Sequence, residues 1–113
     1  MKTFVLMTKV ATPEAQLIEV GARIRNQDRS RQIWFKQIQE LCPEVKFLAH
    51  YALLGYWDFM DIYEAPDEET AAKVSMLSRA HGAHLVESWS AIPYEKLQEL
   101  ANEINSLGRD YSA

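Results

Sequence analysis

The chain has 113 residues, of which 48% are apolar and 25% charged, as expected for one soluble globular domain spanning residues 1–113. Its formal net charge is −4 and it contains a single cysteine, Cys42, so we expect neither a nucleic-acid partner nor an intrachain disulfide. The opening residues lack a secretory signal pattern, and no apolar run approaches the roughly 18 residues of a membrane span. We therefore expect a cytoplasmic protein with no membrane partner.

The first part of the chain predicts a strand followed by two helical segments. Residues 2–9 are apolar on both parities, which is typical of a strand buried on both faces. Thr12-Pro13 is a helix-start pattern, and we expect a break at 26–28 before the helix resumes. Cys42-Pro43 ends that helix, because the residue before a proline is forced out of the helical region.

The middle of the chain predicts a β-hairpin. Strands at 46–54 and 57–65 flank Gly55-Tyr56, and a glycine in the first position of a two-residue loop is typical of a type II′ turn. These residues are therefore expected to form a tight turn between two antiparallel strands.

The last third of the chain predicts a helix, a strand and a second helix. Acidic residues in 66–69 favour a helix start, and Gly82 is expected to end that helix in a left-handed conformation. Residues 83–92 then form a strand. A final helix begins at Pro93 and carries an apolar stripe of Leu97, Leu100, Ala101, Ile104 and Leu107. We expect 108–113 to be a flexible tail.

This order predicts an α+β, ferredoxin-like split βαβ fold, in which a four-stranded antiparallel sheet carries two helices on one face. The predicted strands are apolar on both parities, so the second face of the sheet also needs a cover. The C-terminal helix is expected to cover part of it and a second copy of the chain the remainder. We therefore expect a homodimer or a higher homo-oligomer.

Two segments resemble a known family. Residues 54–58 read Leu-Gly-Tyr-Trp-Asp and residues 63–67 read Tyr-Glu-Ala-Pro-Asp, which resembles the GYD domain family. Trp57 stands where that family usually has a tyrosine, and the resemblance extends from Phe4 to about Ile92. It implies a dimeric α/β-barrel, in which two ferredoxin-like sheets pack face to face. That group includes cofactor-free monooxygenases, isomerases, haem enzymes and ligand-sensing domains, so the fold implies no single function.

The hairpin register brings a histidine beside an aspartate. With a two-residue turn, His50 faces Asp61, and directly opposed residues share one side of the sheet. The same register pairs Leu54 with Trp57, Ala52 with Phe59, and Leu48 with Tyr63. We predict that the ligand-binding residues on this face are His50, Trp57, Phe59, Asp61 and Tyr63, and that the face lies inside the dimer. The opposite face, which includes Tyr51, Met60 and Ile62, is expected to pack under the helices.

A carboxylate beside an imidazole fixes the imidazole tautomer and stabilises its protonated form, as a general base requires. His50 and Asp61 are therefore the candidate catalytic residues if the protein is an enzyme. The leading prediction is that the protein binds a small organic molecule between the sheet and a partner subunit. One alternative is a cofactor-independent enzyme of oxygenase or isomerase type. The other is a purely structural interaction module, in which the two side chains only satisfy each other.

We predict no cofactor and no metal. The spacing of His81 and His84 is not that of a metal pair, and the scattered glycines form no phosphate-binding loop. The one local basic cluster contains Arg23, Arg25, Arg29 and Arg31. It is interpreted first as a solvated surface and second as an anion site.

Overall fold

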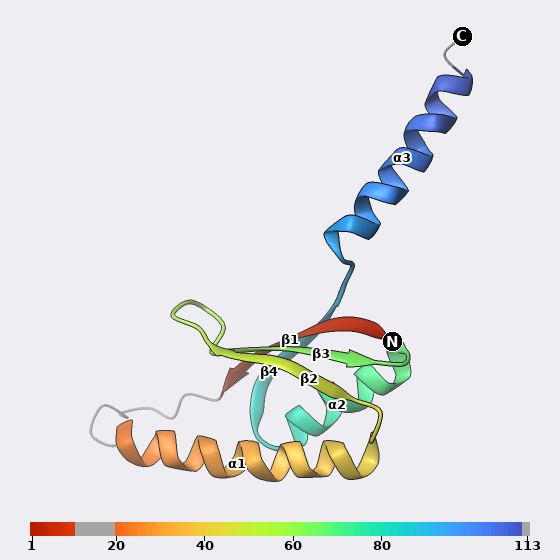
Figure 1. Ribbon diagram of the computed structural model, residues 1–113. Helices are drawn as coiled ribbons and strands as arrows, with labels where there is room; N and C mark the ends of the chain where they lie inside the picture. The colour runs from red at the N-terminus through yellow and green to blue at the C-terminus, as the bar shows by residue number, and fades with distance from the viewer. Residues whose placement is uncertain (11–19, 112–113) are drawn as a thin grey trace.

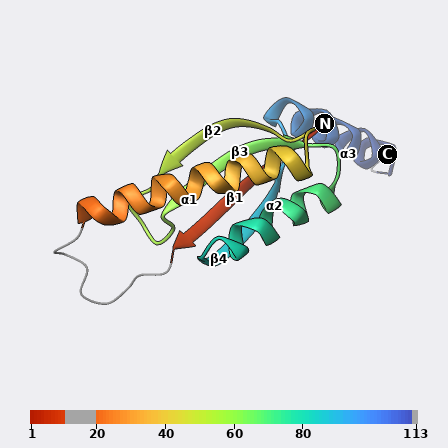
Figure 2. The ribbon, with the colours of Figure 1, turned by 90° about the horizontal axis from the view of Figure 1, so that it is seen from below.

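The computed structural model describes residues 1–10 and 20–111, with the backbone alone at 20–28, 30 and 109–111. Its elements are β1 (Lys2–Val10), α1 (Val20–Leu41), β2 (Lys46–Ala52), β3 (Phe59–Ala65), α2 (Glu68–Ala80), β4 (Ala83–Ala91) and α3 (Tyr94–Tyr111) (Figure 1). The strands pair antiparallel in the order β2-β3-β1-β4, and α1 and α2 lie on one face of the sheet (Figure 2). This arrangement confirms the predicted ferredoxin-like fold.

The core lies between the sheet and the two covering helices. Phe4 on β1 and Tyr63 on β3 stack with ring centroids 5.6 Å apart, and Phe47 lies 5.6 Å from Tyr63. Trp34 and Ile38 of α1 are buried in the same cluster. Each such side chain stabilises the fold by about 1.5–3 kcal/mol on burial, so this aromatic cluster fixes α1 against the sheet.

The structure reverses the predicted assignment of the two sheet faces. Asp61 and Tyr63 are 2% and 0% exposed and lie under α1 and α2, whereas Tyr51 and Trp89 on the opposite face are 53% and 46% exposed. Both parities of the strands are apolar, so the pattern alone does not say which set meets the helices. The aromatic side chains of Tyr63 and its neighbours decide which face meets the helices, because their rings fill the space beneath Trp34.

The sheet face opposite α1 and α2 is called the open face below. The strand registers place two rows of side chains across it. The rows are Tyr51–Met60–Met7–Glu87 and Ala49–Ile62–Val5–Trp89.

The predicted type II′ turn is wrong. The strands end at Ala52 and Phe59, and the backbone N–H of Leu53 still donates to the carbonyl of Asp58 at 2.9 Å. Residues 53–58 therefore form a wider loop. A type II′ turn needs a positive φ at Gly55, but among the described glycines only Gly82 has one.

The predicted hairpin register is correct near the loop and fails farther from it. His50 pairs with Asp61 and Ala52 with Phe59, as expected. A bulge then shifts the pairing between Phe47 and Ala49, so Tyr63 pairs with Phe47 instead of Leu48. The bulge turns the large Phe47 ring toward Trp34, with ring centroids 5.2 Å apart, and so keeps it in the core.

Helix α1 differs from the prediction. Its backbone is helical without interruption from 20 to 41, so the expected break at 26–28 is wrong. Polar residues there favour a break locally, but they are compatible with a helix whose other end is held by tertiary packing. The predicted helix start at Thr12-Pro13 lies outside the described residues.

The N-terminus of α2 follows the prediction closely. Asp67 caps the helix, and its carboxylate accepts hydrogen bonds from the Thr70 hydroxyl at 2.7 Å and the Thr70 backbone N–H at 2.8 Å. These bonds lower the pKa of Asp67 below its ordinary value. Gly82 has a φ of 94°, so the chain turns there from α2 into β4 as expected.

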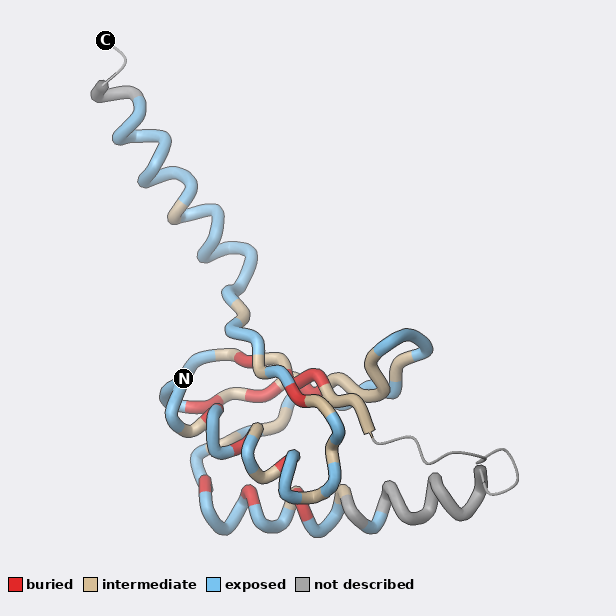
Figure 3. Tube along the Cα trace, turned by 180° about the vertical axis from the view of Figure 1, so that it is seen from behind, coloured by how far each residue is buried: buried red, intermediate tan, exposed pale blue. Residues whose placement is uncertain are grey.

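Helix α3 points away from the rest of the molecule (Figures 1 and 3). Leu97, Ile104 and Leu107 are 51%, 69% and 56% exposed, and α3 packs against none of the other helices and strands. The expectation that it covers the sheet is therefore wrong, and the helix continues to Tyr111, past residue 108, where a flexible tail was predicted to begin. The radius of gyration is 18.6 Å. A compact chain of this length has about 13 Å.

Candidate functional site

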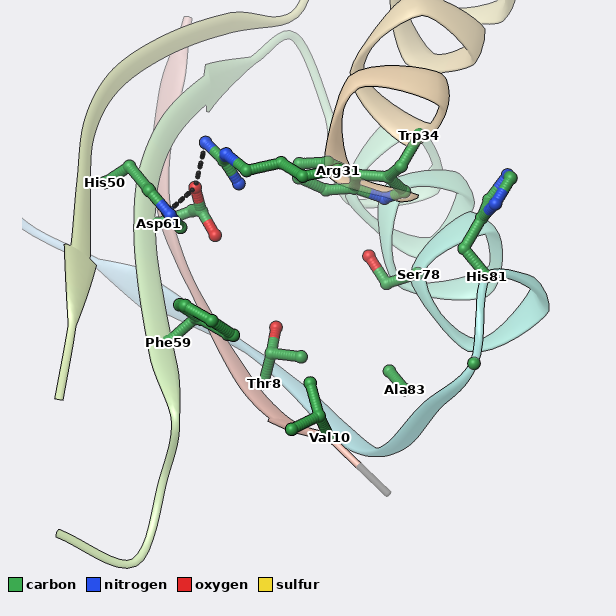
Figure 4. Close-up of a pocket in the computed structure, with 11 residues that line it drawn as sticks. Thr8, Val10, Arg31, Trp34, His50, Phe59, Asp61, Ser78, His81 and Ala83 are labelled. Atoms are coloured by element: carbon green, nitrogen blue, oxygen red, sulfur yellow. Dashed lines mark hydrogen bonds and ion pairs between the residues drawn. The ribbon is translucent and has the colours of Figure 1, made fainter. Parts of the chain in front are cut away.

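A pocket lies between the sheet and the two covering helices (Figure 4). Its volume is about 140 Å³, and its lining includes residues at the end of β1 and in the turn from α2 into β4. The lining residues are Thr8, Val10, Arg31, Trp34, His50, Phe59, Asp61, Ser78, His81, Gly82 and Ala83. The pocket therefore lies on the sheet face that carries His50 and Asp61, but between the sheet and its helices instead of between the sheet and a partner subunit, as was predicted.

Asp61 is the polar centre of this pocket. Its side chain is only 3% exposed, and its Oδ1 accepts from the guanidinium of Arg31 at 3.0 Å and lies 2.8 Å from Nδ1 of His50. Because a carboxylate only accepts hydrogen bonds, it favours the His50 tautomer with hydrogen on Nδ1. The neutral ring then keeps a lone pair on Nε2, as a hydrogen-bond acceptor or a base needs.

The neighbours of Asp61 come from different elements. His50 is opposite it on β2, and the His50 ring stacks on Phe59 with centroids 5.4 Å apart. Arg31 reaches it from α1, and its guanidinium carbon lies 5.4 Å from the centroid of the Trp34 ring. These aromatic contacts restrict the rotation of the His50 and Arg31 side chains, so both partners of the Asp61 carboxylate have a fixed orientation.

Polar side chains of α2 and its C-cap residue also line the pocket. The Ser78 hydroxyl donates to the carbonyl of Val74, one helical turn earlier, at 2.9 Å. Nε2 of His81 lies 2.6 Å from the side-chain oxygen of Gln37, which can only accept, so Nε2 donates. Both hydrogens are therefore used within the protein, and these groups offer acceptor capacity to the pocket.

The predicted site residues separate into two groups. His50, Phe59 and Asp61 line the pocket together. Tyr63 shares their face but belongs to the core, where burial raises the pKa of its hydroxyl despite a 3.3 Å contact with Ser88 Oγ. Trp57 is in the 53–58 loop and packs edge-on against Tyr56, and it is not a lining residue.

Sequence reasoning missed the helical half of the pocket. Arg31 was grouped with a basic surface, yet it lies one turn before Trp34 and two turns before Ile38, on the buried side of α1. That spacing was visible in the sequence. An arginine on an apolar helix face needs an acidic partner, which would have pointed to Asp61.

Asp58 anchors the loop beside the pocket. Its carboxylate accepts from the backbone N–H of Val10 at 2.9 Å and lies 3.7 Å from the ammonium of Lys9. The backbone N–H of Asp58 in turn donates to the carbonyl of Thr8 at 2.9 Å. The aspartate of the 54–58 segment thus ties the hairpin loop to the end of β1, which supplies one wall of the pocket.

Comparison with known proteins supports the family resemblance seen in residues 54–58 and 63–67. The sequence profile of the GYD domain matches residues 15–101. The chain belongs to the GYD domain family. The described residues of this chain contain no cluster of three or more histidine, cysteine or carboxylate side chains able to hold a metal ion. No helix among the residues with described placement is both long and apolar enough to cross a membrane.

The chain is also similar to individual proteins. It is 27% identical over 97 residues to the "Glutamine synthetase and cystathionine beta-lyase binding protein" of Thermus thermophilus, and the match covers 86% of this chain and 95% of that protein. Two solved structures are 16% identical. They are FFRP-DM1, with a TM-score of 0.47 over 81% of this chain and 100% of that one, and the hypothetical protein PHS023 from Pyrococcus horikoshii, with 0.46 over 82% and 92%.

Proposed function

We propose that this GYD domain binds a small organic molecule in the pocket between the sheet and the covering helices, and that it acts as a homo-oligomer. The observation that carries the proposal is the buried Asp61 carboxylate, which orients His50 and Arg31 around a cavity. A lining with apolar walls and a few convergent polar groups is typical of a small-molecule site. The volume of about 140 Å³ is below the roughly 300 Å³ of drug-sized sites, so the ligand is small.

Screening by NMR with a library of small metabolites tests this proposal. We expect a binder to shift the resonances of pocket residues and His50→Ala to abolish its binding. The matched control is Tyr51→Ala, because Tyr51 is the next residue on β2 and is 53% exposed on the other side of the sheet. Equal affinity in the wild type and His50→Ala would remove His50 from the site.

The open face supports self-association. Tyr51 and Trp89 are about half exposed there, and the apolar stripe of α3 is exposed as well. Exposed apolar surface of this extent is typical of a contact with another chain, and a two-fold homodimer is the commonest such assembly. Light scattering at micromolar concentration should therefore give at least a dimeric mass, and a monomeric mass would contradict the assembly.

A cofactor-independent enzyme is the second candidate, favoured by the 2.8 Å contact between Asp61 and Nδ1 of His50. That contact leaves Nε2 able to abstract a proton from a bound molecule. Incubating small carbonyl compounds in D₂O and following the loss of their α-proton NMR signals tests this role. Exchange that is faster with the wild type than with His50→Ala would support it, and equal exchange would exclude His50 as the base.

A protein-interaction module is the third candidate. The name of the Thermus thermophilus relative describes binding to two enzymes, and α3 presents an apolar stripe that the described domain does not cover. Calorimetry with purified glutamine synthetase tests this candidate. Binding that is lost in Ile104→Asp but kept in His50→Ala would favour this module over the pocket, and no binding would count against it.

A further inference from the structure

The indole N–H of Trp34 has no acceptor. Trp34 is 6% exposed, and its Nε1 is the only buried side-chain nitrogen or oxygen without a hydrogen-bond partner among the residues whose side chains are described. Tryptophan can only donate at this atom, and almost all buried donors in folded proteins are paired. The exception requires an explanation at this position.

The unpaired donor belongs to a pocket-lining side chain. In Figure 4 the Trp34 ring lies between Arg31 and Ser78, with its nitrogen on the edge toward Ser78. The Ser78 hydroxyl donates to Val74, and its oxygen makes no hydrogen bond with the indole nitrogen. A molecule seated in the pocket with an oxygen against this edge would supply the missing acceptor.

The charges of the pocket favour an uncharged acceptor. Among the described lining residues, Arg31 and Asp61 are the cation and the carboxylate, and they pair with each other at 3.0 Å. The remaining titratable lining residues are His50 and His81, which contact Asp61 and Gln37 respectively. A second carboxylate would meet the charge of Asp61 in a partly buried space, whereas an uncharged oxygen would not.

The pocket also offers acceptors. When its Nδ1 hydrogen bonds Asp61, the neutral ring of His50 has an unshared pair on Nε2, and Ser78 Oγ keeps its lone pairs. A volume of about 140 Å³ corresponds to roughly five water molecules at about 30 Å³ each. A compact amide matches the pocket in size. It also matches the pocket in hydrogen bonding, because it carries one carbonyl acceptor and an N–H donor.

We infer that the pocket takes a small uncharged carbonyl compound, of which a primary amide is the best match, with its oxygen accepting the Trp34 indole N–H. The inference rests on the proposed function, because it names the ligand class of the same pocket. The Trp34 contact fixes the carbonyl end, and His50 or Ser78 accepts from the other end of the molecule.

Three probes of similar shape separate the possible chemistries. They are isobutyramide (an uncharged acceptor), isobutyrate (an anionic acceptor) and isobutylammonium (a cation without an acceptor). Each is titrated into ¹⁵N-labelled protein while the indole N–H resonances are followed. The sequence has three tryptophans, and the resonance that disappears in Trp34→Phe identifies Trp34.

Isobutyramide should shift the Trp34 resonance saturably and bind more tightly than the other two probes. Trp34→Phe should weaken its binding about 5- to 10-fold, as expected for one hydrogen bond. Trp89→Phe is the matched control and should leave binding unchanged, because that indole donates to Glu87 on the open face at 2.7 Å. A circular dichroism spectrum identical to that of the wild type shows that a variant is folded.

Three results would overturn the ligand class and leave the proposed function standing. The first is isobutyramide binding that moves the resonances of His50 or Ser78 but neither shifts Trp34 nor weakens in Trp34→Phe. The second is a preference for isobutyrate or isobutylammonium in the same pocket. The third is the absence of binding by all three probes. Absence of any pocket binder in the metabolite screen as well would overturn the proposed function itself.

Discussion

Asp61 should tolerate the loss of either of its two partners but not the loss of both. Its side chain is 3% exposed, whereas those of Arg31 and His50 are 31% and 33% exposed. Replacing one partner, with Arg31→Met or His50→Leu, removes one charge-assisted hydrogen bond and leaves the other in place. Each variant should lower the free energy of unfolding by about 1–2 kcal/mol, because solvent weakens a hydrogen bond whose donor is partly exposed.

The double variant leaves a buried carboxylate without a charged partner. Breaking a buried ion pair from one side costs about 3–5 kcal/mol, and the double variant should cost at least that much. The loss should therefore exceed the sum of the two single losses by about 1–2 kcal/mol. Adding Asp61→Asn to the double variant should recover stability, because a neutral amide costs less to bury than an unpaired charge.

Urea denaturation followed by circular dichroism measures these differences, with an unchanged dependence on urea as the check that the unfolding remains two-state. Arg31→Met keeps much of the aliphatic stem, so lost packing contributes little to its effect. Losses that add to within about 0.5 kcal/mol would refute the reasoning, because other groups would then be holding the carboxylate. Failure of Asp61→Asn to restore stability in the double variant would lead to the same conclusion.

Three further predictions concern other parts of the chain. Burial raises the pKa of Cys42 above its ordinary 9.0, so a thiol reagent should label it slowly at neutral pH in the folded protein and rapidly in urea; fast labelling of the folded protein would contradict this. The lowered pKa of Asp67 means that its contribution to stability is present above pH 3.8 and is lost as the pH falls below that value; the unfolding free energy of Asp67→Asn should therefore depend less on pH in that range. Ile104→Asp should weaken self-association in light scattering without changing the circular dichroism spectrum, since Ile104 is 69% exposed and α3 packs on none of the other elements; an unchanged mass would show that α3 does not take part.

The His50–Asp61 pairing was predictable although the turn was not. The strands that flank loop 53–58 end at Ala52 and Phe59. The backbone hydrogen bond from Leu53 to Asp58 extends the same antiparallel register by one more pair. A two-residue turn and this wider loop therefore place His50 opposite the same residue. The register failed at Phe47, where a bulge that depends on packing against α1 changed the pairing, and the predicted pair of Leu54 with Trp57 lies in the loop and does not form.

The face that carries this pair was not predictable from the strands alone. Tyr51 and His50 are neighbours on β2, and the strand patterns left either of them compatible with the core. The rotation of α1 about its axis decided the outcome, since it brings Trp34 and Ile38 over Tyr63 and directs Arg31 at Asp61. Such docking depends on contacts distant in sequence, and local propensity carries little information about them.

The side chains of β2 alternate between the two faces of the sheet, and this also makes the proposed functions separable. His50 belongs to the pocket and Tyr51 to the open face, although they are adjacent residues of one strand. If the proposals hold, His50→Ala should therefore perturb ligand binding while leaving the open face intact, and a polar change at Tyr51 should do the reverse. Loss of ligand with an unchanged oligomer assigns binding to the pocket within one subunit. Loss of ligand on changing Tyr51 would instead show that assembly of the chains shapes the site.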